Sequence, residues 1–389
     1  MEAKPKLFMK SKLRSLLVGL ALIAGIHSAL AQPTLEIIQT NNQSLLYWPS
    51  NAVGFVLQGT TNLAALNWVS ATDAIPATYG SQTAMTVTNS SSARFFRLFQ
   101  NVTPPSGMAL IPAGSFTIGD TLDMISSAIP TNVYLSAFFM DTNLVRFYEQ
   151  WSPVLSYAIS HGYGFDNLGS AKDANHPAGN LNWYDVVKWC NARSQQAGLT
   201  PVYYTDAGFT QVYTNGDVDI TNANVNWSAN GYRLPTSAEW EKAARGGLSG
   251  QRFPLGLTIS ESQANYSANT NEAYDLGPEG SNTNYNYTGY PYTSPVGSFA
   301  ANGYGLYDMA GNMNEWCWDW YAVPPYPAGS PYLGGTDPHG PLTEIVYYRV
   351  TRGGGWSSEG ADLRCAFPNA FAPSAVANGT IGFRCVKGL

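Results

Sequence analysis

The four cysteines are the residues of this chain best suited to redox or metal chemistry, because a thiolate can attack electrophiles, bind soft metals or pair as a disulfide. They are Cys190, Cys317, Cys365 and Cys385, and the first 189 residues hold none. No Cys-x-x-Cys pair occurs and the chain has 4 histidines, so a zinc site is not expected. An even number of cysteines in an exported protein favours disulfides over free thiols.

Nucleophilic catalysis by serine or cysteine would also need a histidine held by a carboxylate. His161, His176 and His339 are scattered in loop-like contexts, where a histidine is more often a surface residue than a base or ligand. No Ser-His-Asp triad is therefore expected.

Two predicted helices would position part of this chemistry. Asn182 can cap a helix that runs to about Gln196 and places apolar side chains and Cys190 on one face. The segment 236–239, Thr-Ser-Ala-Glu, is a capping box that opens a second helix, which the Gly246-Gly247 pair ends. The remaining C-terminal sequence is rich in Gly, Asn and Tyr, which favours irregular loops with short strands.

The segment 1–31 has the features of a signal peptide. Four lysines and Arg14 form a basic stretch, residues 15–26 form a short apolar run, and Ala29-Leu30-Ala31 fits an A-x-A cleavage site. The apolar run is short for a membrane span, so stable membrane insertion is not expected. We expect a secreted or periplasmic protein.

The segment 33–100 is predicted to be a small β-sandwich-like domain. Short alternating or apolar runs are separated by Asn, Gly, Ser and Pro clusters, and they lie at 34–39, 45–48, 54–58, 84–88 and 94–98. The pattern resembles a β module of exported bacterial proteins, to which no chemistry is attached. Its aromatic residues are expected to form its core. Residues 101–107 are a predicted linker to a larger domain at 108–386.

The composition excludes some partners. Charged residues make up 12% of the chain, which is about half of the usual share, and the formal net charge is −6. No basic stripe follows the N-terminal segment, so nucleic acid is not an expected partner.

Seven motifs in a fixed order carry a family resemblance. They are Gly107–Gly119, Asn182–Asn191, Gly231–Glu241, Asn302–Asn312, Glu315–Trp320, Arg352–Trp356 and Gly382–Cys385. Together they resemble the formylglycine-generating enzyme (sulfatase-modifying factor) family over roughly 108–386. The resemblance implies an α+β fold related to C-type lectins, loop-rich with few helices. The chain departs from the family near Asp141–Asn143, where a deletion of several residues is expected.

Active members of this family use copper and oxygen to oxidise a sulfatase cysteine to formylglycine. The resemblance implies two copper-binding cysteines shortly after the Arg-Gly-Gly motif, but Ser358 and Gly360 stand there. A serine hydroxyl stays protonated near neutral pH and is a hard ligand, so it cannot replace a thiolate for copper(I). Copper is therefore not an expected cofactor. A relocated catalytic role for Cys365 is the less favoured alternative.

The same resemblance implies two disulfides. Cys190 and Cys385 match positions that are paired in the family. The usual partner of the Cys365 position falls near Ala244, so Cys317 is expected to pair with Cys365 instead. Two unpaired buried thiols remain the alternative for this second pair.

Structural calcium is the cofactor that the resemblance implies. Asp308, Gly311, Met313 and Glu315 match the tighter ion site of the family, and carboxylates with backbone carbonyls suit calcium.

The second calcium site of the family is matched by Asn265, Tyr266 and Tyr290. A family carboxylate there is replaced by Thr288, so weaker binding is expected, although Asp275 lies near enough in sequence to substitute.

Two functions remain in competition. The favoured one is a non-catalytic binding or scaffold protein with an extracellular peptide, protein or glycan ligand. The alternative is a divergent formylglycine-generating oxidase that acts on sulfatase cysteines. The sequence indicates neither the ligand nor the oligomeric state.

Overall fold

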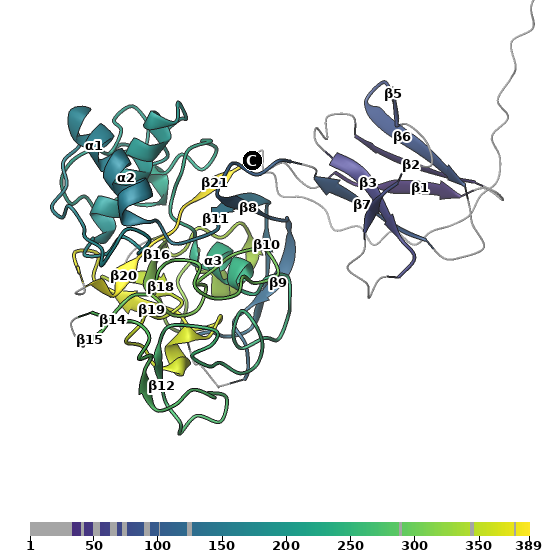
Figure 1. The fold of residues 1–389 in the computed structure, drawn as a ribbon. Coiled ribbons are helices and arrows are strands. Elements are labelled where there is room, and N and C mark those ends of the chain that lie inside the picture. Colours follow the sequence, from purple (N-terminus) through teal and green to yellow (C-terminus); the bar gives the residue numbers. More distant parts are fainter. Residues whose placement is uncertain are drawn as a thin grey trace, which may run out of the picture. The chain divides into compact units, whose positions relative to one another are not determined.

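The structure is a computed structural model in which short gaps separate the described stretches (Figure 1). It describes residues 33–39, 43–49, 55–62, 68–71, 76–88, 94–100, 102–122, 127–287, 290–342, 346–376 and 379–389. The predicted signal peptide at 1–31 and Thr288 lie outside the described residues. Among the described residues, no helix is both long and apolar enough to cross a membrane.

The N-terminal segment forms two small antiparallel sheets. The first has the strand order β1-β2-β6-β5, with β1 at Glu36–Gln39, β2 at Gln43–Pro49, β6 at Gln82–Thr88 and β5 at Ala77–Tyr79. The second has the order β4-β3-β7, with β4 at Val69–Ser70, β3 at Phe55–Thr60 and β7 at Phe95–Gln100. Their buried cluster consists of Leu46, Trp48, Leu57, Met85 and Val87. Alternate residues of β2 are buried, as expected for strands that cover a core on one face.

Three α-helices lie among the described residues of the C-terminal region. Helix α2 (Trp183–Gln196) begins as predicted, because Asn182 Oδ1 accepts a hydrogen bond of 2.8 Å from Asp185 N. Helix α3 (Ser237–Ala244) follows the predicted capping box. Helix α1 (Ser152–Ser160) is not among the predicted helices. It follows a π-helical turn at Phe147–Trp151, and no side chain caps its N-terminus.

The remaining regular structure consists of short strands and single turns. One sheet has the order β21-β11-β8, with strands Val386–Gly388, Phe138–Asp141 and Met108–Ile111, and another has the order β17-β10-β9, with strands Gly335–Thr336, Thr131–Leu135 and Gly114–Ile118. Two ribbons pair β12 (Ser267–Ala268) with β13 (Gly280–Ser281) and β14 (Asn286–Tyr287) with β15 (Tyr290–Pro291). Three 3₁₀ turns lie at Asn222–Asn224, Pro331–Leu333 and Gly360–Leu363.

A four-stranded sheet positions the motifs. Its order is β19-β18-β16-β20, with strands Asn369–Phe371, Arg349–Arg352, Asn314–Trp320 and Ile381–Gly382. Strand β16 is buried along its whole length, and its Glu315 lies opposite Arg352 on β18 and Gly382 on β20. Three motifs that are separate in sequence therefore meet at Glu315.

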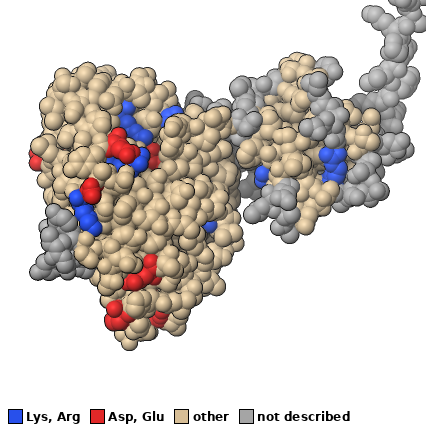
Figure 2. Space-filling model, in the orientation of Figure 1, with Lys and Arg blue, Asp and Glu red and all other residues tan. Residues whose placement is uncertain are grey.

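Tryptophan dominates the largest buried cluster, which packs α2 against β16. Trp151 and Trp189 are stacked with ring centres 5.5 Å apart, and Phe383 packs edge-on against both rings. The surface in Figure 2 is largely uncharged, as expected for a chain with few charged residues. The predicted α+β class, loop-rich with few helices, is confirmed.

Candidate functional site

The loop after β18 holds the positions where the family's copper ligands were expected. Gly353 and Gly354 have φ angles of 87° and 64°, and a Cβ on Gly354 would lie 2.5 Å from Leu363 Cδ1. Two glycines are therefore required for the sharp turn at this point. Ser358 closes the turn, since its Oγ accepts a hydrogen bond of 3.1 Å from Gly355 N. The Ser358 hydroxyl thus holds the loop and has no histidine beside it.

Gly360 lies in a tightly packed position. A Cβ there would lie 3.1 Å from Asp275 Oδ2. The Asp275 carboxylate accepts hydrogen bonds from Tyr266 Oη, Asn269 N and Gly277 N. It therefore already fixes local structure, which weakens the suggestion that Asp275 replaces a missing calcium ligand.

All four cysteines are buried as thiols. The sulfur atoms of Cys190 and Cys385 lie 3.6 Å apart, whereas no such contact joins Cys317 to Cys365 in the described part of the chain. The two expected disulfides are thus not formed in this structure. Burial raises the pKa of the Cys365 thiol to about 12, so Cys365 is not a thiolate at neutral pH.

The histidines occupy three separate environments. His161 stacks on Tyr157 and His339 stacks on Trp227. His176 is buried against Thr293, and burial lowers its pKa to about 4. No histidine of the described chain lies beside a serine and a carboxylate in a catalytic arrangement.

The two carboxylates of the predicted tighter ion site are both buried. Glu315 Oε2 accepts hydrogen bonds from Trp240 Nε1 at 2.9 Å and from Arg384 Nε at 2.7 Å. Glu315 Oε1 accepts one bond, of 2.8 Å, from Arg384 Nη2. A carboxylate oxygen has two acceptor positions, so Oε1 keeps one for a cation.

Asp308 provides the strongest sign of a cation in this region. Its Oδ2 accepts a hydrogen bond of 2.7 Å from Gly297 N, but its Oδ1 is buried without a partner. Burial raises the pKa of Asp308 to about 6, although the Gly297 N–H, the Arg384 guanidinium and the Asn312 side chain favour its charged form. Asp308 also lines a surface hollow together with Asn302 and Met309.

These residues fit a calcium ion. Asp308 and Glu315 would supply charge, and the carbonyls of Gly311 and Met313 would supply further oxygens. The Gly311 carbonyl also accepts a hydrogen bond of 2.9 Å from Met313 N. Gly311 has φ 75°, and a Cβ there would lie 2.5 Å from the carbonyl oxygen of Asn265, so glycine is required. In the described residues no three His, Cys, Asp or Glu side chains converge as ligands, so the carbonyls are essential to the site.

The positions of the weaker ion site are already used by the protein. The Asn265 carbonyl accepts a hydrogen bond of 2.8 Å from Asn312 N, and the Tyr266 carbonyl accepts one of 3.3 Å from Asn282 N. Tyr290 lies in β15, next to residues outside the described chain. Weak binding at this second site stays a prediction.

An aromatic pair beside the loop was not predicted as part of a site. Trp356 stacks on Tyr292 with ring centres 5.7 Å apart, and Trp356 Nε1 donates to the Gly379 carbonyl at 3.4 Å. Trp356 is half-buried, so part of its ring can contact a ligand. The two residues are 64 positions apart, and no local pattern of the sequence indicates that they meet.

Comparison with known proteins places this geometry in context. A family described as "Sulfatase-modifying factor enzyme 1-like domain" matches residues 96–389. The chain is 32% identical over 282 residues to the "Chaperone protein LppX" of Paenibacillus barcinonensis, a match that covers 70% of this chain and 86% of that one.

Two further proteins share the C-terminal region. The "Formylglycine-generating enzyme" of Thermomonospora curvata is 42% identical over 161 residues, a match that covers 40% of this chain and 49% of the enzyme. The match therefore spans about half the length of that relative. The solved structure of "Treponema denticola variable protein 1" is similar at a TM-score of 0.53 and 27% identity, covering 77% of this chain and 97% of that one.

Proposed function

Because the chain belongs to the sulfatase-modifying factor enzyme 1-like family and yet has Ser358 and Gly360 where copper-binding thiols were expected, we propose that it is a non-catalytic binding or scaffold protein. The observation that carries this proposal is the use of Ser358 as a structural hydrogen-bond acceptor. A loop closed by a serine hydroxyl holds no soft ligand for copper(I).

The remaining thiols do not supply a substitute. All four are buried, and burial raises the pKa of Cys190, Cys317 and Cys365. A buried thiol with a raised pKa is a poor metal ligand and a poor nucleophile at neutral pH. The chemistry of the family is therefore not expected to have moved to another cysteine.

A polypeptide is the ligand class that we favour, with an extracellular glycan as the second class. The name of the Paenibacillus relative describes a chaperone, which supports a protein client. The stacked Trp356 and Tyr292 provide an aromatic surface beside the loop that could pack against either ligand.

The proposal also includes a structural calcium ion and a secreted or periplasmic location. The unpartnered Asp308 Oδ1, together with Glu315, supports a structural calcium ion. The signal-peptide features of 1–31 support a secreted or periplasmic location.

Anaerobic copper(I) titration against a chromophoric chelator tests the non-catalytic proposal, with the Thermomonospora enzyme as the positive control. We expect the control to take copper from the chelator and this protein to leave it there. A Ser358→Cys, Gly360→Cys variant should gain affinity. One copper(I) bound by the unaltered protein as tightly as by the control would overturn the proposal in favour of the oxidase alternative.

The binding role is tested separately with arrays of unfolded-protein peptides and extracellular glycans. Trp356→Ala should weaken the binding of any positive probe, whereas Tyr148→Ala should not, because Tyr148 is an exposed aromatic residue in another region. Equal binding by the Trp356 variant and the unaltered protein would remove this surface from the proposal. No binding to any probe would contradict the binding role.

A further inference from the structure

The three-stranded sheet of the N-terminal segment carries aromatic side chains on both faces. Phe96 and Leu98 of β7 pack against the buried cluster of that segment. Alternate residues of a strand point to opposite faces, so Phe95, Arg97 and Phe99 lie on the other face. Gln58 pairs with Arg97 across the strands and belongs to the same face. A solvated sheet face is ordinarily polar, so aromatic rings here require an explanation.

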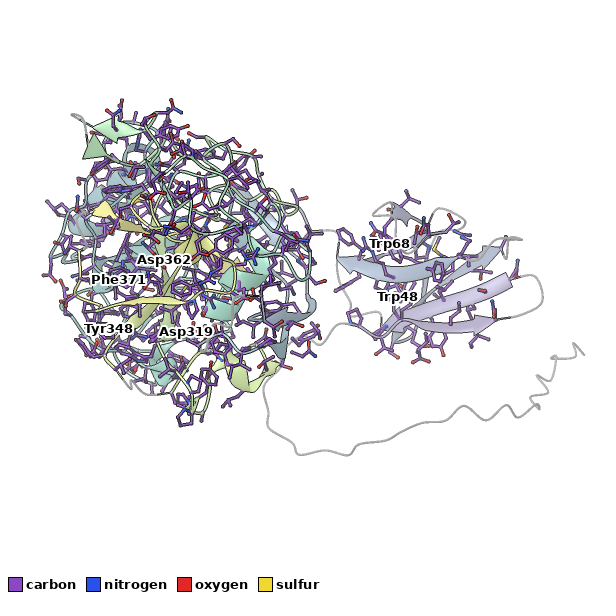
Figure 3. All side chains as sticks on the ribbon, turned by 90° about the horizontal axis from the view of Figure 1, so that it is seen from below. Trp48, Trp68, Asp319, Tyr348, Asp362 and Phe371 are labelled. Atoms are coloured by element: carbon purple, nitrogen blue, oxygen red, sulfur yellow. The ribbon has the colours of Figure 1, made fainter. Side chains whose placement is uncertain are left out.

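Trp68, just before β4, extends this outer face. The Arg97 guanidinium lies 4.4 Å from the ring centre of Trp68 and 5.2 Å from that of Phe99. Trp68, Arg97 and Phe99 are all half-buried, so part of each side chain is open to solvent. Trp48, the other tryptophan labelled in this segment in Figure 3, belongs to the buried cluster. The expectation that the aromatic residues form the core thus holds for Trp48 and fails for Trp68.

Arg97 is held by Gln58 and has no carboxylate partner among the described residues. The Nε and Nη2 atoms of Arg97 donate to Gln58 Oε1 at 3.0 Å and 2.8 Å. These two are the hydrogen bonds that the Arg97 side chain forms with described residues. Burial lowers the pKa of Arg97, and no nearby acid opposes that effect. The Nη1 edge of the guanidinium remains available to accept an anion in a fixed orientation.

We propose that this face, built from Trp68, Gln58, Arg97 and Phe99, binds an anionic polysaccharide. The aromatic rings offer flat apolar surfaces for sugar rings, and the open edge of Arg97 matches the planar arrangement of oxygens in a carboxylate or sulfate. The only acidic residue described in this segment, Glu36, accepts a hydrogen bond from Tyr47 Oη and lies on β1 of the other sheet. Among the described residues on the face of this segment seen in Figure 2, basic side chains are visible and acidic ones are not. This site is independent of the C-terminal loop and of the function proposed for it.

Biolayer interferometry with the full chain and four immobilised polymers tests the proposal. The probes are polygalacturonate, dextran sulfate, neutral dextran and polyglutamate. We expect binding to one or both anionic polysaccharides that weakens with salt, and at least about tenfold weaker binding to dextran and polyglutamate. The comparison of polygalacturonate with dextran sulfate distinguishes a carboxylated from a sulfated sugar.

Single-residue variants test whether this face binds the polymer. Arg97→Gln and Trp68→Ala should each weaken binding at least about tenfold. Arg97→Lys, which keeps the charge but loses the planar fork, should have an intermediate effect and controls for misfolding. Arg94→Gln is the matched control, because it removes the same charge from beside Phe96, which packs toward the core.

Several results would overturn the proposal. Binding of all variants equal to that of the unaltered chain would place the polymer elsewhere. An equal loss in the Arg94 variant would indicate attraction by net charge alone. If polyglutamate binds as tightly as the anionic polysaccharides, the occupant is an acidic polypeptide and the proposal is wrong. If no polymer binds, the proposal is also wrong.

Discussion

Arg384 and Glu315 form a fully buried ion pair with two hydrogen bonds, of 2.7 Å from Nε to Oε2 and 2.8 Å from Nη2 to Oε1. Arg384 also donates to the carbonyl of Tyr307 at 2.8 Å. The pair thus joins the Gly-Phe-Arg-Cys end of the chain to β16 and to the segment that begins the predicted calcium site. Its side chains are wholly shielded from solvent, so loss of either partner leaves a bare charge in the core.

The first prediction concerns this pair. Arg384→Met should lower the free energy of unfolding of the calcium-free chain by about 3–5 kcal/mol, because Glu315 then loses its counter-ion in a buried position. Urea denaturation of the purified chain measures the change. Arg146→Met is the control, since Arg146 pairs with Glu149 at a partly exposed site and its loss should cost less than about 1 kcal/mol.

A double variant refines the test. Glu315→Gln with Arg384→Met removes both charges and should be less destabilised than Arg384→Met alone. Comparable losses in the single and double variants would show that an uncompensated charge is not the cause.

The second prediction concerns the thiols. On oxidation, Cys190 and Cys385 should form a disulfide, because their sulfur atoms are already 3.6 Å apart. The link would close a loop of nearly 200 residues and could stabilise the chain by about 4–5 kcal/mol in the chain-entropy model. Peptide mapping under non-reducing conditions identifies the bond. A Cys190 that stays free after full oxidation would contradict the prediction.

The expected Cys317–Cys365 disulfide is examined in the same map. The structure shows no sulfur contact between these residues, so we expect them to remain thiols, the alternative that the sequence left open. A peptide that links them would show that oxidation rearranges this part of the core.

The helices illustrate what the sequence could predict. Asn182 and Thr236 act through hydrogen bonds to residues three positions later, so the signal and its effect lie within one turn. Helix α1 has no such cap, and only Val154 and Ala158 of its residues are buried. Its stability comes from packing against other parts of the chain, which local patterns do not report.

The candidate sites depend mostly on contacts between residues far apart in the sequence, which local patterns do not predict. The positions of the predicted ion site, Asp308 and Glu315, could be matched from the sequence because they lie in two consecutive motifs, seven residues apart. The partner of Glu315 is 69 residues away, and Trp68 meets Arg97 only through the pairing of β3, β4 and β7. Such contacts depend on sheet register, which amino-acid types alone do not determine.

The third prediction concerns Asp319, which is almost completely buried. Its Oδ2 accepts a hydrogen bond of 2.7 Å from Ser237 N, while its Oδ1 has no partner. Burial raises the pKa of Asp319 to about 7, so the folded protein holds its proton more tightly than the unfolded chain does. The resulting stability is complete below about pH 4 and is lost as the pH rises through about 7.

Asp319→Asn removes this titration. The stability of the variant relative to the unaltered protein should therefore increase steadily from pH 4 to pH 8. Urea denaturation at several pH values in this range measures the difference. A difference that does not change with pH would mean that Asp319 does not titrate in this window.

The fourth prediction concerns calcium. Addition of a chelator should lower the melting temperature, because an ion that binds only the folded state stabilises it by about 2.7 kcal/mol at a concentration one hundred times its dissociation constant. Asp308→Asn should abolish most of the response, whereas Glu149→Gln, which changes an exposed acid, should leave it intact. Calorimetry should show one tight site. Two sites of equal affinity would contradict the weak second site expected from Thr288.

The last prediction concerns activity. The protein should not convert cysteine to formylglycine in a sulfatase-derived peptide, because the loop that follows β18 has neither of the two expected thiols. Ser358 accepts a hydrogen bond from Gly355 N, and Gly360 packs against Asp275, so the loop is held by interactions that do not need a metal. The nearest later cysteine, Cys365, is buried, and its raised pKa keeps it protonated.

The test is mass spectrometry of a cysteine-containing sulfatase peptide after incubation with copper-loaded protein, oxygen and a reductant. The Thermomonospora enzyme provides the positive control, and a reaction without protein provides the background rate. We expect product in the first reaction and no product above background from this chain. Conversion of the thiol to an aldehyde above that background would restore the oxidase alternative. Cys365→Ser would then show whether that thiol supplies the chemistry, since no other cysteine follows the Arg352–Trp356 motif closely enough in sequence to replace the missing pair.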